Sequence, residues 1–379
     1  MSPSRVPYSA NDHRRRRLAE RQSVLITGGA GFIGTNLAAR LAASSVPVLI
    51  YDNLSRPGVA RNLAWLRATY GDAVTVEIAD VRDALALRAA TARASAVFHF
   101  AAQVAVTTSL ADPGQDFAVN AAGTFNLLEA LRACANPLPL VFTSTNKVYG
   151  AIDDLALENR AKRYAPAAGR PFGIDETRPL DFHSPYGCSK GAADQYVLDY
   201  ARSYGLPAVV FRMSCIYGPH QRGTEDQGWV AHFLLRALAD APITIYGDGH
   251  QVRDILYVDD LIDAFLLAQR RMDRLRGQAF NIGGGSANTT SLIELIDRIA
   301  LLHGRRPKVD YGAWRTGDQK YYVSDTAKFG RATAWRPRVT ADEGVARLYH
   351  WLRQNIGSNA ATLVEAGVAR ATNTVSAAT

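Results

Sequence analysis

Short apolar segments alternate with helix-like segments along the chain from residue 23 onward. Strand-length runs that are apolar and partly β-branched occur at residues 23–27, 46–51, 74–78, 96–100, 138–144, 208–213 and 279–282. Helical stretches are predicted at residues 34–43, 124–133 and 192–204. Because repeated strand–helix alternation requires right-handed crossover connections, the pattern predicts an α/β fold with a doubly wound parallel sheet.

The first predicted strand runs directly into a glycine-rich turn, TGGAGFIG at 27–34, and then into the first predicted helix. Gly28, Gly31 and Gly34 let the backbone turn tightly, approach a pyrophosphate and pack the helix against the strand. The helix N-terminus adds free N–H groups and a partial positive charge. The spacing is GxxGxxG rather than GxGxxG, but its place between strand and helix predicts a Rossmann-like dinucleotide site.

Acidic residues end the next two strands. Asp52 stands eighteen residues after Gly34, where a carboxylate accepts hydrogen bonds from the adenosine ribose and repels a 2′-phosphate. NAD is therefore favoured over NADP, a preference that the nearby Arg56 weakens. Asp80 is placed to meet the adenine edge. The small residues of FAAQ (100–103) let a flat cofactor lie against the backbone.

Tyr186 and Lys190 stand four residues apart in YGCSK (186–190), so a helix places both side chains on one face. The ammonium, together with an oxidised nicotinamide ring, favours the phenolate and lowers the tyrosine pKa towards working pH. Tyr186 is expected to remove a hydroxyl proton while hydride leaves the same carbon.

The net charge of +8 does not by itself predict nucleic-acid binding. Residues 1–22 hold six arginines, four of them at 14–17, against two acidic residues, so half of the excess lies in a leader that we expect to be disordered. The rest has no basic patch interleaved with aromatic residues, which argues against a nucleic-acid partner. A diffuse positive potential suits a diphosphate substrate.

The cysteines and histidines predict neither a disulfide framework nor a metal site. Cys134, Cys188 and Cys215 are odd in number and widely spaced, as expected for reduced, packed thiols in a cytoplasmic protein. No Cys/His cluster has metal-ligand spacing, and His99 is expected to be a satisfied core histidine. No apolar run is long enough for a membrane span, and no apolar segment of a secretory signal follows the first arginines.

The combination of TGGAGFIG, FHFAAQ (98–103), Asn120, FTSTNKVYG (142–150) and YGCSK resembles the extended short-chain dehydrogenase/reductase family of NAD-dependent epimerases and dehydratases. The likeness extends over residues 23–356. In that family a Ser or Thr at the position of Thr145 hydrogen-bonds the reacting hydroxyl. The resemblance therefore implies Thr145, Tyr186 and Lys190 as the catalytic residues.

The two residues after Thr145 separate possible reactions. Similar sugar 4,6-dehydratases carry an Asp-Glu pair there, and related decarboxylases keep a glutamate, whereas this chain has Asn146 and Lys147. Neither takes a proton as a carboxylate would, so dehydration and decarboxylation are disfavoured. Epimerisation, in which hydride leaves and returns, needs only the tyrosine, lysine, threonine and cofactor.

Longer motifs resemble a narrower group, the CDP-paratose 2-epimerases, also called CDP-tyvelose epimerases. They include DNLSRPG (52–58), QVAVTTS (103–109), VVFRMSCIYG (209–218), EDQGWVAHF (225–233) and GHQVRD (249–254). The resemblance implies C2 inversion of a CDP-linked deoxysugar through a keto intermediate, with a tightly bound, recycled NAD. It also implies a homodimer or homotetramer, paired through helices near 121–134 and 188–204.

The resemblance assigns two further groups of residues. Thr107, Thr108 and Asn146 are expected to hold the sugar, and Arg253, Arg315 and Asp318 the nucleotide. The expected cofactor residues are Gly28, Gly31, Phe32, Ile33, Gly34, Asp52, Asn53, Ser55, Arg56, Asp80, Val81, Ala101, Ala102, Gln103, Asn120, Thr143, Tyr186, Lys190 and Met213.

These expectations divide the chain into a leader (1–22), an NAD-binding Rossmann domain (23–218, with a return segment 253–284), a nucleotide-sugar domain (219–252 and 285–356) and a flexible tail (357–379). Segment 151–180 is either a cover for the sugar or a surface loop. Two other functions remain open. A UDP-sugar 4-epimerase uses the same catalytic set, and an NAD-binding sensor or scaffold would not need the intact Thr145, Tyr186 and Lys190.

Overall fold

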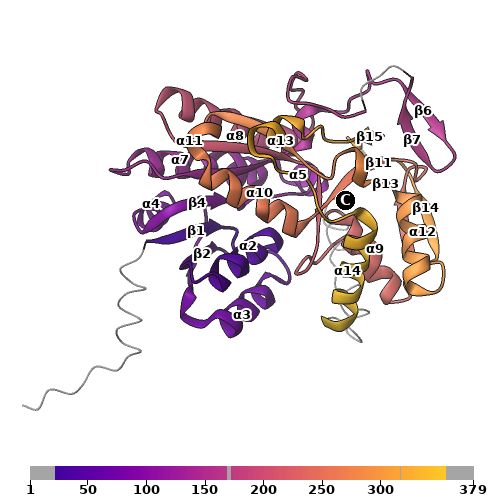
Figure 1. Cartoon of the computed structure of the whole chain (residues 1–379), viewed down its shortest axis with the longest axis horizontal. Coiled ribbons are helices and arrows are strands. Elements are labelled where there is room, and N and C mark those ends of the chain that lie inside the picture. The colour runs from indigo at the N-terminus through magenta and orange to yellow at the C-terminus, as the bar shows by residue number, and fades with distance from the viewer. Residues whose placement is uncertain (1–21, 169–171, 316, 356–379) are drawn as a thin grey trace, which may run out of the picture.

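The computed structural model describes residues 22–168, 172–315 and 317–355. The expected flexible tail lies outside the described residues, as does the expected basic leader apart from residue 22. Figure 1 shows a layered α/β body in which helices flank a central sheet.

Seven strands of the described chain form one parallel sheet in the order β12–β8–β5–β4–β1–β2–β3. Their bounds are β1 (Ser23–Thr27), β2 (Val48–Asp52), β3 (Val74–Ile78), β4 (Ala94–His99), β5 (Leu140–Thr145), β8 (Ala208–Met213) and β12 (Gln278–Ile282). The chain builds β1 to β3 in one direction and continues with β4 on the other side of β1. The carboxyl ends of β1 and β4 therefore form the switch point at which such sheets bind ligands, and the predicted doubly wound sheet is confirmed.

Helices cover both faces of this sheet (Figure 1). One face buries apolar side chains of α2 (Phe32–Ala43), α3 (Val59–Tyr70), α10 (Val258–Arg270), α11 (Met272–Leu275) and α13 (Ala327–Thr333). The other face buries those of α4 (Ala84–Thr91), α7 (Gly123–Arg132) and α8 (Ser184–Ser203). The sheet is thus packed between two hydrophobic cores, one on each face, and this packing holds the carboxyl ends of its strands in place.

Some predicted boundaries were wrong, each for a local reason. Strand β2 begins at Val48 rather than residue 46, since Pro47 has no N–H for a sheet hydrogen bond. Helix α8 begins at Ser184 with Pro185 in its first turn, so the expected helix at 186–190 and the predicted helical stretch 192–204 belong to one helix.

The C-terminal part forms smaller sheets around its own core. Strand β11 (Val252–Tyr257) pairs with β9 (Cys215–Tyr217), β13 (Thr289–Ser291) and β15 (Tyr321–Tyr322), while β10 (Ile243–Tyr246) pairs with β14 (Val309–Gly312). The helices α9 (Trp229–Leu238), α12 (Leu292–His303) and α14 (Ala341–Asn355) bury apolar faces here. The region 223–249 contains the strand β10 as well as helix α9.

Segment 151–180 contains an antiparallel hairpin of β6 (Leu157–Arg160) and β7 (Arg163–Pro166). Arg163 Nε donates to Glu294 on α12 at 2.6 Å, and Lys162 Nζ contacts Asp297 of the same helix at 2.7 Å. The hairpin is thus fastened to α12. None of the helices in the described ranges is long and apolar enough to span a lipid bilayer.

Candidate active site

The turn after β1 is a cradle of main-chain atoms at the sheet's switch point. Gly28 has φ +67°, and a Cβ there would lie 2.6 Å from the backbone N of Ala101 after β4. A Cβ on Gly34 would lie 2.5 Å from the carbonyl oxygen of Gly28. Gly31 directly precedes α2 as its N-cap. Only glycine fits these approaches, so the backbone lies bare beside a helix N-terminus, the arrangement that accepts a pyrophosphate.

Asp52, at the end of β2, faces this turn. Its Oδ2 accepts the N–H of Ala30 at 3.0 Å and its Oδ1 that of Leu54 at 2.8 Å. Burial raises the pKa of Asp52, and the two backbone donors oppose that shift. A carboxylate has about four acceptor positions, so each oxygen keeps capacity for a ribose hydroxyl, and the residues present fit a dinucleotide.

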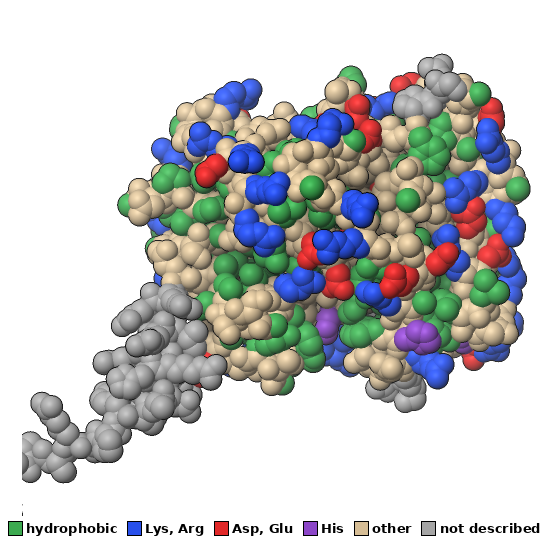
Figure 2. All heavy atoms as spheres, in the orientation of Figure 1, with side chains coloured by type: hydrophobic (Ala, Val, Ile, Leu, Met, Phe, Trp, Pro, Cys, Tyr) green, Lys and Arg blue, Asp and Glu red, His purple; other side chains and the backbone are tan. Residues whose placement is uncertain are grey.

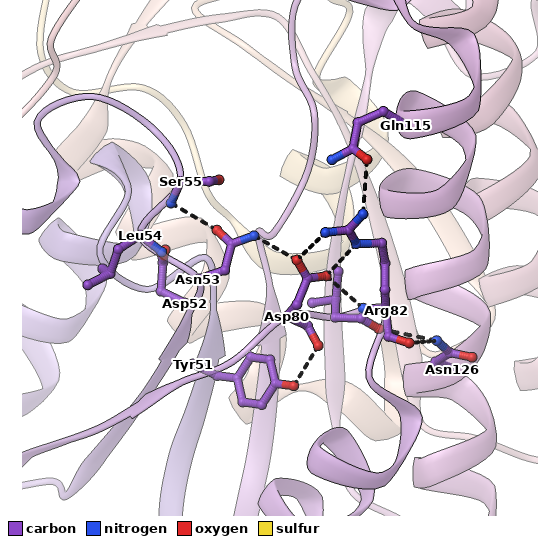
Figure 3. A network of polar contacts seen from close by, with 10 residues as sticks. Tyr51, Asp52, Asn53, Leu54, Ser55, Asp80, Arg82, Gln115 and Asn126 are labelled. Atoms are coloured by element: carbon purple, nitrogen blue, oxygen red, sulfur yellow. Dashed lines mark hydrogen bonds and ion pairs between the residues drawn. The ribbon is translucent and has the colours of Figure 1, made fainter.

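Asp80 lies at the centre of a polar network beside this site (Figure 3). Its carboxylate accepts from the backbone N, Nε and Nη2 of Arg82 at 2.8–2.9 Å and from Asn53 Nδ2 at 2.8 Å. The hydrogen bonds from Arg82 hold the pKa of Asp80 well below its usual range. Asp80 can therefore meet an adenine only if Arg82 or Asn53 releases an acceptor position. The adenine contact stays a prediction.

The other expected cofactor residues after β2 and β3 take different roles in the fold. The backbone N of Ser55 donates to Asn53 Oδ1 at 3.1 Å. Arg56 donates to Gln227 Oε1 at 2.5 Å, which links the segment after β2 to the loop before α9. Val81 is buried, and a Cβ on Gly123 of α7 would lie 2.7 Å from its Cγ2.

The segment after β4 is clamped by an asparagine. Asn120 lies in a π-helical turn (Ala118–Ala122), a rare conformation that often marks functional sites. Its Oδ1 accepts the N–H of Gln103 at 2.9 Å and its Nδ2 donates to the Gln103 carbonyl at 3.0 Å. The half-buried Ala101 and Ala102 are thus held beside the glycine turn.

Three of the expected cofactor residues have apolar side chains. Phe32 and Ile33 at the start of α2 and Met213 at the end of β8 are partly buried against the core of that sheet face. They occupy the carboxyl edge of the sheet, as the sequence predicts, and their contacts with a cofactor stay predictions.

Lys190 is buried on α8 and reaches β5. Its Nζ donates to the carbonyl oxygen of Thr143 at 2.7 Å and lies 4.4 Å from the centroid of the Phe142 ring. Burial lowers the pKa of Lys190 to about 8, and the charges of Asp194 and Asp116 partly restore it. The hydroxyl of Thr143 in turn donates to the His99 carbonyl at 3.0 Å.

Tyr186 is buried on the same helix, as the i, i+4 spacing predicts. Burial raises the pKa of Tyr186 to about 12, while a hydrogen bond with Thr145 and the charge of Arg56 lower it and Asp116 raises it. The expectation that the Lys190 ammonium and an oxidised nicotinamide together lower this pKa stays a prediction, and in the protein alone Lys190 donates to the Thr143 carbonyl. The phenol is a buried neutral group that needs a further positive charge to ionise.

Thr145 ends β5 and also caps the short 3-10 helix Asn146–Tyr149, since its Oγ1 accepts the N–H of Lys147 at 3.2 Å. The Asn146 amide donates to Gln319 Oε1 at 3.1 Å and accepts from Thr145 Oγ1 at 3.4 Å. Asn146 is therefore engaged by protein groups, and its contact with a sugar stays a prediction.

Lys147 differs from the sequence expectation in one respect. Its Nζ donates to the carbonyl of Gly317 at 3.0 Å. Burial and the charge of Arg253 lower the pKa of Lys147 to about 8, although Asp318 opposes that shift. The sequence did not indicate this lowered pKa, and the expectation that Lys147 does not take a proton as a carboxylate would stays a prediction. The described site still has no carboxylic acid side chain directly after Thr145.

The two expected sugar residues on α5 (Val106–Ala111) are followed by a serine that the sequence reasoning did not single out. Thr107 and Thr108 are exposed, whereas Ser109 is buried and its Oγ accepts the backbone N–H of Tyr186 at 3.1 Å. Ser109 thus holds the N-terminal turn of α8. The sequence motif contained Ser109, but no local pattern marked it.

Arg253 and Asp318, both expected to hold the nucleotide, contact each other. Arg253 Nη2 donates to Asp318 Oδ1 at 2.7 Å, and the arginine is buried. Arg315 lies instead 3.8 Å from the centroid of the Tyr246 ring and donates to the Glu225 carbonyl at 2.9 Å. Arg315 is therefore held by the loop before α9.

The structure agrees with the sequence expectation for His99 but not with that for Cys188. His99 is buried with Thr27 Oγ1 at 2.6 Å from Nδ1 and Thr124 Oγ1 at 3.1 Å from Nε2, as expected of a core histidine. Cys134 and Cys215 are partly buried, but Cys188 is exposed, because position 188 of α8 faces outward between buried neighbours. The expectation that Cys188 is packed was wrong. Among the described side chains no group of His, Cys, Asp or Glu could hold a metal ion.

Basic and acidic side chains are interspersed on the face that Figure 2 shows, and no continuous basic patch covers that face.

Several polar groups of the site escaped prediction from sequence. Asp116 is buried next to Ser189 and Asn120, and Gln319 is buried against Asn146. Asp194 and Arg212 form a buried bidentate pair behind Lys190, with both contacts at 2.9 Å. Apart from Asn120, which lies four residues after Asp116, their partners are distant in the sequence, so the fold brings them together.

Comparisons with known proteins agree with this geometry. Residues 24–283 match the model of the NAD dependent epimerase/dehydratase family. The chain is 42% identical over 334 residues to the CDP-paratose 2-epimerase of Salmonella typhi, covering 86% of this chain and 98% of that protein. The UDP-glucose 4-epimerase of Thermotoga maritima with UDP-glucose is similar in structure, with a TM-score of 0.76, 30% identity and coverage of 88% and 99%.

The Thermus thermophilus UDP-glucose 4-epimerase, solved with NAD, has a TM-score of 0.73 and 33% identity over 88% of this chain and 99% of its own. Its cofactor agrees with the glycine cradle and the Asp52 carboxylate described above. The chain therefore belongs to the NAD-dependent epimerase/dehydratase family, and it is an enzyme that uses NAD.

Proposed function

We propose that this enzyme inverts C2 of a CDP-linked deoxysugar, converting CDP-paratose to CDP-tyvelose or acting on a close CDP-sugar. The observation that carries the proposal is the 42% identity to a CDP-paratose 2-epimerase along 98% of that relative. The site supports it chemically, because no carboxylic acid follows Thr145 to drive a dehydration.

Tyr186 is the proposed base. Its phenol is buried and hydrogen-bonded with Thr145, and Thr145 is fixed in turn by the N–H of Lys147. NAD, when bound, supplies a hydride acceptor that returns the hydride and a positive ring that favours the phenolate. Tyr186 then holds the sugar's C2 hydroxyl proton while C2 is a ketone, and gives the proton back after the sugar has turned its other face.

Two sets of side chains divide the binding. Gly28, Gly31 and Asp52 would hold the cofactor's pyrophosphate and ribose. Arg253 would hold the substrate's diphosphate, because its guanidinium is buried and already oriented by Asp318. Arg315 joins it only if it leaves Glu225.

The decisive experiment incubates the purified protein with CDP-paratose and, separately, with UDP-glucose in heavy water. We expect inversion of CDP-paratose at C2 without deuterium at that carbon, because the removed hydride itself returns. Inversion of UDP-glucose alone would make the enzyme a UDP-sugar 4-epimerase. Deuterium at C2 would contradict the hydride cycle, and no turnover of either sugar would favour an NAD-binding sensor.

The proposed base has its own test. Tyr186→Phe removes only the hydroxyl, so we expect turnover to fall by about 10²–10⁴-fold while NAD stays bound. Bound NAD is measured after denaturing the protein and quantifying the released nucleotide. Wild-type turnover in this variant would refute the role.

We also propose a homodimer or homotetramer paired through α7 and α8. An aromatic group on this side of the protein is exposed, with relative accessibilities of 60% for Phe117, 42% for Phe125, 50% for Tyr196 and 59% for Tyr204. A second copy would cover this surface isologously. Sedimentation of wild type against Tyr196→Glu tests the pairing, since a charge at its centre should yield monomers.

Two further expectations complete the proposal. The division into an NAD-binding domain (residues 23–218 and 253–284) and a nucleotide-sugar domain (219–252 and 285–356) is supported by the separate core around α9, α12 and α14. A cytoplasmic location is supported by the three free cysteines. Limited proteolysis and cell fractionation test these two points.

A further inference from the structure

Asp116 is a buried carboxylate at a junction of three segments of the site. It lies on α6 (Pro113–Phe117) and is fully shielded from solvent. Its Oδ1 accepts from Gln103 Nε2 and Asn120 Nδ2, each at 3.1 Å. Its Oδ2 accepts from the hydroxyl of Ser189 at 2.5 Å. One side chain thus joins three segments: the loop after β4 that contains Gln103 (here called the cofactor loop), the π-helical turn with Asn120, and α8 with Ser189.

The orientation of both amides follows from their backbone contacts. Asn120 Oδ1 accepts the N–H of Gln103, and Gln103 Oε1 accepts the N–H of Ala105. A backbone N–H can only donate, so the oxygens face these groups and the two amino groups face Asp116. Asp116 therefore receives three donors. Burial raises the pKa of Asp116, and the hydrogen bond from Ser189 and the charge of Lys190 oppose that shift and favour the ionised carboxylate.

The negative charge reaches both residues proposed for proton transfer. Ser189 directly precedes Lys190, and the charge of Asp116 supports the Lys190 ammonium against its burial. The same charge disfavours ionisation of Tyr186. The other groups that face this pair are Asp194 behind Lys190, Thr145 and Arg56 beside Tyr186, and His99, whose burial lowers its pKa to about 3 and leaves it neutral.

We propose that Asp116 is a positioning residue of this enzyme, which aligns α8 with the cofactor loop through Ser189, Asn120 and Gln103 and supplies the negative charge that keeps Lys190 an ammonium. The inference rests on the proposed roles of Tyr186 and Lys190. It adds a residue that touches neither sugar nor cofactor but sets the protonation of the pair that does.

The test is an ultraviolet titration of Tyr186 in the NAD complex. The absorbance of each protein is compared with that of its Tyr186→Phe counterpart, so that only the phenolate of Tyr186 is seen and no sugar is needed. In Asp116→Asn we expect this titration to move to lower pH by about one unit, because a nearby negative charge is lost. The alkaline limb of kcat should move to lower pH as well, since Lys190 loses its support.

Asp112→Asn is the matched control. Asp112 caps the same short helix by accepting the N–H of Gln115 at 2.9 Å, and the substitution removes the same charge. It should leave both titrations where they are. A wild-type titration in Asp116→Asn, or an equal shift in Asp112→Asn, would overturn the proposal.

Ser189→Ala provides a second test of the proposal if the Asp116→Asn protein does not fold. It removes one donor from Asp116, which favours the protonated acid, so it should shift both titrations in the same direction by less. Unshifted titrations in this variant would also overturn the proposal. Because the absorbance needs no sugar, failure of the proposed epimerisation would leave this readout intact and the two failures would be distinguishable.

Discussion

The ammonium of Lys190 donates to the carbonyl oxygen of Thr143 at 2.7 Å, which ties helix α8 to the strand that ends at Thr145. This contact holds the lysine against the main chain of β5. Lys190 therefore acts on the site as a buried charge whose ionisation depends on its surroundings.

Activity should fall as pH rises through about 8, because burial lowers the Lys190 pKa to that value and the ammonium is then lost. Since the folded-state pKa lies below the ordinary 10.5, the unfolded chain binds more protons between pH 8 and 10.5. Burying the Lys190 ammonium therefore costs stability below pH 8, and this cost disappears as pH rises across that window while activity falls. A pH profile of kcat checks this. The residual activity of Lys190→Arg should show no alkaline limb there, and an unchanged limb would contradict the assignment.

Asp52→Ala should weaken NAD binding by about 10- to 100-fold, since a hydrogen bond to a charged group contributes about 1.5–3 kcal/mol. The preference for NAD over NADP should shrink too, because the charge that repels a 2′-phosphate is gone. Calorimetric titration of nucleotide-free protein measures both. Asp83→Ala is the control, since Asp83 only caps α4, and equal losses in the two variants would count against a cofactor contact.

Gly34→Ala should abolish NAD retention and lower the melting temperature. The added Cβ would meet the Gly28 carbonyl at 2.5 Å and Gly29 Cα at 2.6 Å, and main-chain atoms cannot move aside as a side chain can. Gly114→Ala provides the comparison, because its Cβ would have only an ordinary contact of 3.7 Å. Thermal unfolding and bound-nucleotide analysis of both variants decide the matter.

Asp194→Ala should cost about 3–5 kcal/mol in the free energy of unfolding, since it leaves the buried Arg212 guanidinium without its counter-charge. Glu343→Ala breaks an exposed ion pair with Arg347 and should cost less than about 1 kcal/mol. Denaturant titration compares them. Similar losses would show that the buried pair is not a structural anchor.

Contiguous features of this protein were predictable from sequence, and features assembled from distant segments were not. The strand, glycine turn and helix at 23–43 follow one another, so local spacing alone placed Gly28 and Gly34 at the sheet edge. Asp116 meets Ser189 across 73 positions, and no pattern near either residue records that contact.

The electrostatics of the site were the least predictable part. The spacing of Tyr186 and Lys190 gave the correct shared face, but the sign of the tyrosine pKa shift depends on burial and on where the lysine points. Both follow from the packing of α8 against β5. Prediction of a pKa from a motif fails when desolvation is the largest contribution.

The glycine cradle has one more consequence. A surface made of main chain has no side-chain rotamers. A pyrophosphate that binds at Gly28 and Gly34 therefore costs no side-chain conformational entropy there. Such a surface is also unable to relax away from its ligand. The stiffness of the turn would therefore slow release of the dinucleotide, as the proposed reuse of one NAD molecule through many cycles requires.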